Sequence, residues 1–134
     1  MPKFFLSLPV ADIKRSTAFF KSLGFAFNPA FTSDTSACLA ISDTTSVMLA
    51  PRERFADLTK LEIADPRKAV TGLVSLWFDT REEVDALVDA ALKAGGTEAH
   101  PAEDEGFMYQ RAIYDLDGHG WGISWMDPTA MPPA

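Results

Sequence analysis

Cysteine is almost absent from this chain of 134 residues, since Cys38 is the only one. No disulfide can form within the chain, and this composition fits a reducing compartment. No apolar run approaches the ~20 residues that a membrane helix needs. The first ten residues lack the charged start, apolar stretch and cleavage site of an export signal. We therefore expect a cytoplasmic protein that does not span a membrane.

Positive charge is also scarce, because 12 Lys and Arg stand against 19 Asp and Glu, for a net charge of −7. This balance argues against nucleic acid and anionic membranes as partners, and it tolerates a cationic ligand better than an anionic one. Hydrophobic residues make up 47% of the chain. A chain of this length and composition predicts one globular domain whose core needs no disulfide or structural metal.

The first half of the chain predicts a strand followed by a helix. Phe4 to Val10 is a short apolar run, and a helical spacing of apolar and small residues follows at Ile13, Thr17, Phe20 and Leu23. Asp12 is the expected N-cap of that helix, and Gly24 supplies the left-handed residue that ends it. Three further strands are expected, over Phe25 to Phe31, Ala37 to Ile41 and Val47 to Ala50.

The second half repeats this order. Leu73 to Phe78 predicts a strand, and apolar residues at helical spacing predict a helix at Val84, Leu87, Val88, Ala91 and Leu92. Thr80 and Glu83 have the spacing of a capping box, and Gly95 and Gly96 end the helix. Strands are expected over Thr97 to Pro101, Phe107 to Tyr114 and Trp121 to Met126.

The pattern is therefore an α+β fold of two tandem βαβββ modules with curved mixed sheets around a groove. We place module one at residues 3–50, a connector with a helical turn or two at 51–71, module two at 72–127 and a loose tail at 128–134. One helix cannot cover both faces of a four-stranded sheet, so two modules or two chains must share a core. A groove lined by several strands is the default ligand site.

Several motifs resemble the vicinal-oxygen-chelate superfamily, which includes glyoxalase I, extradiol dioxygenases and bleomycin-binding proteins. They are the duplicated module, the run Leu8-Pro9-Val10-Ala11-Asp12 before the first helix, and Asp115-Leu116-Asp117-Gly118-His119 before the last strand. The resemblance is closest to the branch described as predicted lactoylglutathione lyases. It implies a divalent metal held by His, Gln or Glu on the inner faces of the first and last strands of each module, and a homodimer.

Matched to this chain, the implied metal positions fall at or near Phe5, Met48 or Leu49, Leu73 and Gly122. None carries a ligating imidazole, amide or carboxylate. A catalytic metal site usually needs three ligands of this kind, and the chain's two histidines, His100 and His119, lie at a strand end and past a turn. We therefore expect no bound catalytic metal and no cofactor.

Alternation along the strands places Phe5, Ser7 and Pro9 on one face, Leu73, Ser75 and Trp77 on another, and Gly122, Ser124 and Met126 on a third. The resemblance implies that these faces line the groove, and Met48 comes from the matched metal positions. The candidate ligand-binding residues are Phe5, Ser7, Met48, Leu73, Ser75, Trp77, Tyr109, Arg111, Gly122 and Ser124. Most would form an apolar, aromatic wall with a few hydroxyls, suited to an uncharged or aromatic molecule. The alternative is that the same side chains simply fill the core. Tyr109 and Arg111 share a face and are candidates to orient a ligand carbonyl or carboxylate. Alternatively, Arg111 pairs with Glu103, Asp104 or Glu105 on an outer edge.

Other reactive residues have a structural interpretation beside the functional one. His119 is a candidate general base, or it packs beside the Asp-Leu-Asp-Gly turn. Cys38 is expected as a buried, inert thiol. Trp121 and Trp125 are expected to pack on the face opposite Gly122.

Three functions follow from these observations. The first is a metal-free binder of a small aromatic or cationic molecule. The second is a metal-dependent lyase or extradiol dioxygenase of glyoxalase type, in which the metal acts as a Lewis acid. The third is a scaffold whose groove is filled by its own side chains. Sheet edges and apolar faces left by paired modules also predict a homodimer.

Overall fold

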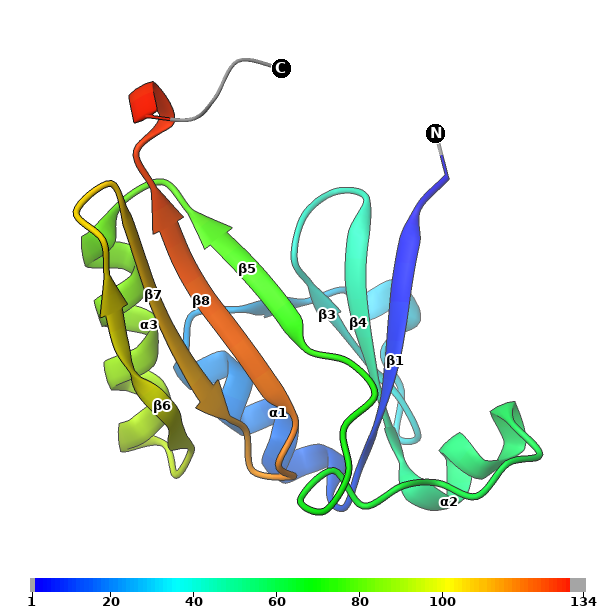
Figure 1. The fold of residues 1–134 in the computed structure, drawn as a ribbon. Helices are drawn as coiled ribbons and strands as arrows, with labels where there is room; N and C mark the ends of the chain where they lie inside the picture. Colours follow the sequence, from blue (N-terminus) through cyan, green and yellow to red (C-terminus); the bar gives the residue numbers. More distant parts are fainter. Residues whose placement is uncertain (1, 131–134) are drawn as a thin grey trace. The chain divides into compact units, whose positions relative to one another are not determined.

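Both halves of the chain fold in the expected order of strand, helix and three strands, in a computed structural model that describes residues 2–130 (Figure 1). The backbone separates into two units, Met1–Asp65 and Pro66–Ala134. Each unit holds one mixed four-stranded sheet. The predicted α+β class with two βαβββ modules is therefore confirmed. Over residues 2–130, no helix is both long and apolar enough to cross a bilayer.

The first unit contains β1 (Phe4–Val10), α1 (Ile13–Ser22), β2 (Ala26–Phe27), β3 (Ala37–Ala40) and β4 (Thr45–Pro51). Its strand order is β1-β4-β3-β2, and β1 runs parallel to β4. Both expected caps of α1 are confirmed. Asp12 Oδ1 accepts the N–H groups of Lys14 and Arg15 at 3.0 and 3.1 Å, and Gly24 has a φ of 96°.

The strand expected over residues 25–31 is wrong beyond Phe27. Only Ala26–Phe27 pair with β3, and Pro29–Phe31 form a 3-10 turn, η1. Asn28 starts this turn, since its Oδ1 accepts the N–H of Ala30 at 3.0 Å. Pro29 has no N–H to donate to a sheet, so the ladder stops there. By contrast β4 is longer than predicted, because it also includes residues 45, 46 and 51.

The second unit contains β5 (Val74–Phe78), α3 (Arg81–Lys93), β6 (Thr97–Asp104), β7 (Met108–Tyr114) and β8 (Gly120–Met126). The strand order is β5-β8-β7-β6, with β5 parallel to β8. Thr80 caps α3 as predicted, since its Oγ1 accepts the N–H of Glu83 at 3.1 Å. Gly95, with a φ of 106°, follows the end of this helix.

Strand β6 extends three residues past the predicted end at Pro101. Its register against β7 shifts between Glu98 and His100 and again between His100 and Glu103. Such irregularities let a strand pass a proline, which cannot donate to the ladder. The extension carries Asp104 to the level of Tyr109.

The segments outside the modules carry short helical turns. The helical spacing in the expected connector corresponds to α2 (Arg52–Phe55) and η2 (Ala56–Leu58). The tail expected from residue 128 begins with the 3-10 turn η3 (Pro128–Ala130), and the rest of it, 131–134, lies outside the described residues.

Candidate functional site

Helix α3 covers one face of the second sheet, and the side chains of β7 and β8 alternate between that face and the opposite, open one. The covered face carries Tyr109, Arg111 and Ile113 from β7, paired with Trp125, Ile123 and Trp121 from β8. Val84, Val88 and Ala91 of α3 are fully buried. This layer is the core of the second unit, and Trp121 and Trp125 lie opposite Gly122 as expected.

The open face brings together four of the predicted site residues. Ser75 pairs with Gly122, and Trp77 pairs with Ser124, across the parallel strands β5 and β8. Trp77 keeps 53% of its surface exposed, whereas Ser124 keeps only 4%. The indole is therefore available to a ligand. Leu73, a fifth predicted residue, precedes the first residue of β5 and is exposed.

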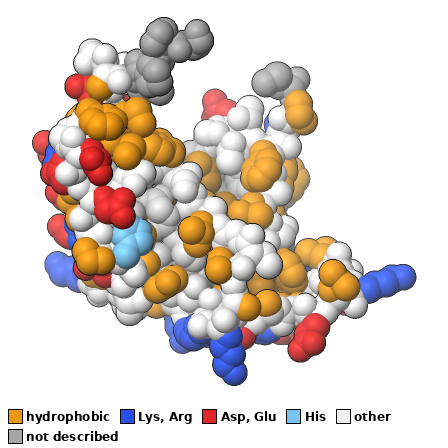
Figure 2. Space-filling model, in the orientation of Figure 1, with side chains coloured by type: hydrophobic (Ala, Val, Ile, Leu, Met, Phe, Trp, Pro, Cys, Tyr) orange, Lys and Arg blue, Asp and Glu red, His pale blue; other side chains and the backbone are white. Residues whose placement is uncertain are grey.

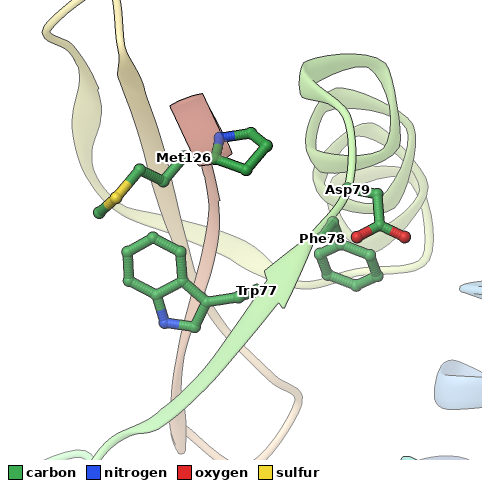
Figure 3. Close-up of a pocket in the computed structure, with 5 residues that line it drawn as sticks. Trp77, Phe78, Asp79 and Met126 are labelled. Carbon is green, nitrogen blue, oxygen red and sulfur yellow. The ribbon is translucent and has the colours of Figure 1, made fainter. Parts of the chain in front are cut away.

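A pocket of about 390 Å³ lies at the carboxyl ends of β5 and β8. Its lining residues are Trp77, Phe78, Asp79, Met126 and Pro128. Figure 3 shows the indole of Trp77 below the side chain of Met126, with Asp79 just beyond the end of β5. The volume is within the range of small-molecule sites. In Figure 2, hydrophobic side chains gather at the top left, over these two strand ends.

Parallel pairing explains why this pocket forms where it does. The register pairs Phe78 with Trp125, so both strands end at the same edge of the sheet. The residues that follow β5 and those that follow β8 therefore come together, although about fifty positions separate them in the chain. Asp79 and Pro128 are the two lining residues that lie outside the strands, just after the ends of β5 and β8.

The charge of the pocket is negative. Asp79 is the only charged side chain among the five lining residues. The neighbouring Asp127 accepts the N–H and Oγ1–H of Thr129 at 2.9 and 2.7 Å. These hydrogen bonds lower the pKa of Asp127 and favour its ionised form. No Lys or Arg side chain lines the pocket within the described residues.

Arg81, the cation that follows Asp79 most closely in the chain, is held elsewhere. Its guanidinium forms a two-pronged pair with the carboxylate of Asp104 and lies 4.4 Å from the ring centre of Tyr109. The hydrogen bond from Arg81 lowers the pKa of Asp104, and in turn raises that of Arg81. The pair ties the start of α3 to the end of β6.

Tyr109 and Arg111 lie against α3, away from the open face. The Tyr109 hydroxyl donates to Asp85 Oδ1 at 2.6 Å, and an Arg111 nitrogen donates to the same oxygen at 3.0 Å and to Asp89 at 3.3 Å. The expected partners of Arg111 on residues 103–105 are therefore wrong, because α3 supplies the carboxylates. The hydrogen bond to Asp85, and then burial, raise the pKa of Tyr109.

The remaining predicted residues belong to the first unit. Phe5, Ser7 and Met48 share one face of its sheet, since Ser7 pairs with Met48 and the side chain of Phe5 lies two positions before Ser7. Phe5 is 44% exposed, and its ring meets that of Phe31 edge-on at 5.9 Å. The two rings form a second aromatic surface, within the first unit.

The turn before β8 is held together by hydrogen bonds to Asp115. Asp115 is buried, and its Oδ1 accepts the backbone N–H groups of Asp117 and His119 at 2.9 and 3.0 Å. Its Oδ2 accepts the indole N–H of Trp121 at 3.0 Å. Burial raises the pKa of Asp115. Cys38 is fully buried, as the interpretation of an inert thiol requires.

The donor set does not fit a divalent metal of the kind that the resemblance implies. The matched positions at residues 5, 48, 49, 73 and 122 offer no imidazole, amide or carboxylate. Within residues 2–130, no three His, Cys, Asp or Glu side chains come close enough to hold a metal ion. A Cβ atom added at Gly122 would lie 3.3 Å from Ser75 Oγ, which is a tight contact.

Sequence reasoning missed most of the pocket. Phe78, Asp79 and Pro128 were not among the residues expected to line the groove. A signal existed for Asp79, because it follows a predicted strand directly and stands before the Thr80 cap. What the sequence does not show is that β5 and β8 run parallel, which brings Pro128 beside Asp79.

Comparisons with known proteins identify the architecture. Residues 4–42 match the family model described as Bleomycin resistance protein-like N-terminal. A solved structure of hypothetical protein SA1046 from S. aureus is 27% identical with a TM-score of 0.77, over 93% of this chain and 92% of that one. A glyoxalase/bleomycin resistance protein/dioxygenase family enzyme from Burkholderia phytofirmans PsJN is 22% identical with a TM-score of 0.76, over 91% and 96%.

A glyoxalase-related enzyme from Fulvimarina pelagi is 19% identical with a TM-score of 0.76, over 90% of this chain and 85% of that one. No curated protein matches the chain. The fold is thus that of the glyoxalase/bleomycin resistance/dioxygenase proteins, and the matches support the superfamily that the sequence resembles. They do not confirm the lactoylglutathione lyase branch.

Proposed function

We propose that this protein binds a small aromatic or cationic molecule at the open face of its second sheet, without a catalytic metal. One observation carries the proposal: a pocket of about 390 Å³ is lined by the half-exposed indole of Trp77 and by Asp79. A large exposed aromatic side chain in an otherwise apolar hollow is costly to leave in water. A flat ligand against the indole would remove that surface from solvent.

The rest of the open face supports a binding role. Met126 adds a flexible, polarizable wall that adapts to different ring systems. Ser75 lies on the same face, beside Gly122, and is exposed, so its hydroxyl can make a directional hydrogen bond with a ligand. A mostly apolar site with few polar groups is typical of small-molecule pockets.

The metal-dependent reactions of glyoxalase type gain no support from the residues present. Lewis-acid catalysis needs at least three ligands around an open position, and the described residues offer no such cluster.

We also propose a homodimer. Large apolar side chains stay exposed on the single chain, including Phe4 at 61% and Phe31 at 53%. A two-fold partner would cover such surfaces on both copies at once. Light scattering coupled to size exclusion should give twice the monomer mass of 14.6 kDa. A monomeric mass at all concentrations would contradict this part of the proposal.

The binding function is tested by a panel of neutral, cationic and anionic aromatic compounds, with thermal shift as the screen and calorimetry for the hits. We expect at least one aromatic compound to stabilise the protein, and Trp77→Ala to remove the stabilisation. Tyr114→Ala is the matched control, because Tyr114 is 43% exposed and lies at the opposite end of β7 from the pocket.

Two results would contradict the proposal. One is the absence of stabilisation by every compound in the panel. The other is an equal loss of binding in the Tyr114→Ala control, which would place the ligand elsewhere or indicate a general effect on folding.

A further inference from the structure

The charge and the lining residues of the pocket restrict the class of ligand that it can bind beyond an aromatic or cationic molecule. This inference rests on the binding function proposed above. We infer that the pocket selects a molecule that carries both features at once, a flat aromatic body and a methylated ammonium group of tertiary or quaternary type. Three properties of the pocket favour such a ligand: its charge, its aromatic surface and its hydrogen-bonding capacity.

The charge of the pocket favours a cation. Asp79 is the only charged side chain in the lining, and Asp127 sits between the lining residues Met126 and Pro128. The amino-terminal end of α3, which would attract an anion, starts two residues after Asp79. That end is already compensated, because Glu82 and Glu83 lie in its first turn and Thr80 caps it. The nearest cation in sequence, Arg81, is bound to Asp104.

The aromatic surface of the pocket also favours a cation. Trp77 and Phe78 both contribute to the lining, and Trp77 is half exposed. Tryptophan is the side chain that binds cations most strongly through its ring face. An ammonium group in the pocket is therefore favoured by two of its lining residues, by the ring face of Trp77 and by the negative charge of Asp79.

The small number of hydrogen-bond acceptors on the lining side chains favours a methylated ammonium group. A primary ammonium has three N–H donors, and each loses a water partner on binding unless the protein accepts it. The side chains of the lining provide one carboxylate and, in Met126, a weak sulfur acceptor. A tertiary ammonium brings one donor and a quaternary ammonium brings none. Methylated ammonium groups consequently lose less on entering this pocket than a primary amine does.

The experiment compares four molecules that share one phenethyl body: phenethyltrimethylammonium, phenethylamine, 2-phenylethanol and 3-phenylpropanoate. Binding to the full chain is followed by calorimetry and by NMR of the Trp77 indole N–H, which the Trp77→Phe variant identifies. For probes of this size a dissociation constant on the order of 1 mM is expected. We expect the trimethylammonium compound to bind about tenfold more tightly than the alcohol and more tightly than the primary amine, with no binding of the carboxylate.

The variant Asp79→Asn should weaken the trimethylammonium compound about fivefold and leave the alcohol unchanged. Asp34→Asn is its matched control, because Asp34 is exposed in the first unit and the substitution changes the net charge equally. Added salt should weaken the binding of the two cationic probes and leave that of the alcohol unchanged. Thermal unfolding of each variant shows whether it is folded before binding is measured.

The outcomes separate this inference from the binding function. Equal binding of the alcohol and the trimethylammonium compound, or tighter binding of the primary amine or the carboxylate, would overturn the ammonium preference while leaving the aromatic site in place. An unchanged affinity in Asp79→Asn would overturn it as well. Failure of all four probes and of the wider aromatic panel would overturn the binding function itself.

Discussion

The hydroxyl of Tyr109 donates a 2.6 Å hydrogen bond to Oδ1 of Asp85, across the interface between β7 and α3. The same oxygen accepts from Arg111 at 3.0 Å. One carboxylate on the helix therefore holds two side chains of one strand, on the face away from the pocket. The arrangement fixes the helix over the sheet whose other face we propose to bind ligand.

We expect Asp85→Ala to lower the free energy of unfolding by about 1–3 kcal/mol, because it leaves a largely buried guanidinium and a phenol without their shared acceptor. Denaturant unfolding measures the change. Asp89→Ala is the control, since Asp89 is 70% exposed and accepts from Arg111 at the longer distance of 3.3 Å. Its loss should stay below about 1 kcal/mol. Equal losses in the two variants would contradict the central role of Asp85.

Tyr109 should ionise at higher pH than an ordinary tyrosine, because its hydrogen bond to Asp85 and its burial raise its pKa. In Tyr114→Phe, ultraviolet absorbance follows Tyr109 alone, and the midpoint should lie above about 10. The neutral phenol contributes stability that is complete below the unfolded-state pKa and is lost as pH rises through the folded-state pKa. Adding Asp85→Ala should lower the midpoint, and an unchanged midpoint would contradict the assigned cause.

Replacing Asp115 tests the turn before β8. Asp115→Ala removes an acceptor from three N–H groups, and we expect a loss of about 2–4 kcal/mol in unfolding free energy. In Asp115→Asn the amide oxygen can still accept the two backbone N–H groups but its nitrogen cannot accept from Trp121. The expected loss is about 1–2 kcal/mol. If Asn were as costly as Ala, the backbone bonds would not be the main contribution.

Gly118 is constrained twice, by a φ of 95° and by Arg67, whose Cγ would lie 2.7 Å from an added Cβ. Gly24 is constrained once, because it has a φ of 96° and open space around it. Gly24→Ala should therefore cost about 1–2 kcal/mol from backbone strain alone, and Gly118→Ala should cost more. Combining Gly118→Ala with Arg67→Ala should reduce the difference in a double-mutant cycle. Equal costs for the two single variants would contradict a steric contribution from Arg67.

Much of the fold could be predicted because local chemistry determines it. Asp12 and Thr80 accept the first helical N–H groups by themselves, and Gly24 and Gly95 adopt the left-handed conformation that ends a helix. These signals lie within a few residues of the structure that they specify. The prediction was wrong at residues 28–31, where Asn28 and Pro29 favour a turn although the neighbouring residues are apolar.

The candidate site was harder to predict because it depends on pairing between distant segments. Alternation alone groups Ser75 with Trp77, but only the parallel register of β5 and β8 places Met126 and Pro128 beside Asp79. The partners of Arg111 were missed for a similar reason. The acidic residues at 103–105 are the nearest carboxylates along the sequence, whereas the actual partners, Asp85 and Asp89, come from a helix more than twenty positions away.

The central position of β8, between β5 and β7, has a kinetic consequence. A strand with neighbours on both sides exchanges its amide hydrogens with deuterated solvent only when the sheet opens. Strand β8, which pairs with the strand that carries Trp77, should therefore be among the slowest parts of the second unit to take up deuterium. A compound would then enter over a surface that is already formed, and its association rate would not depend on how often the sheet unfolds.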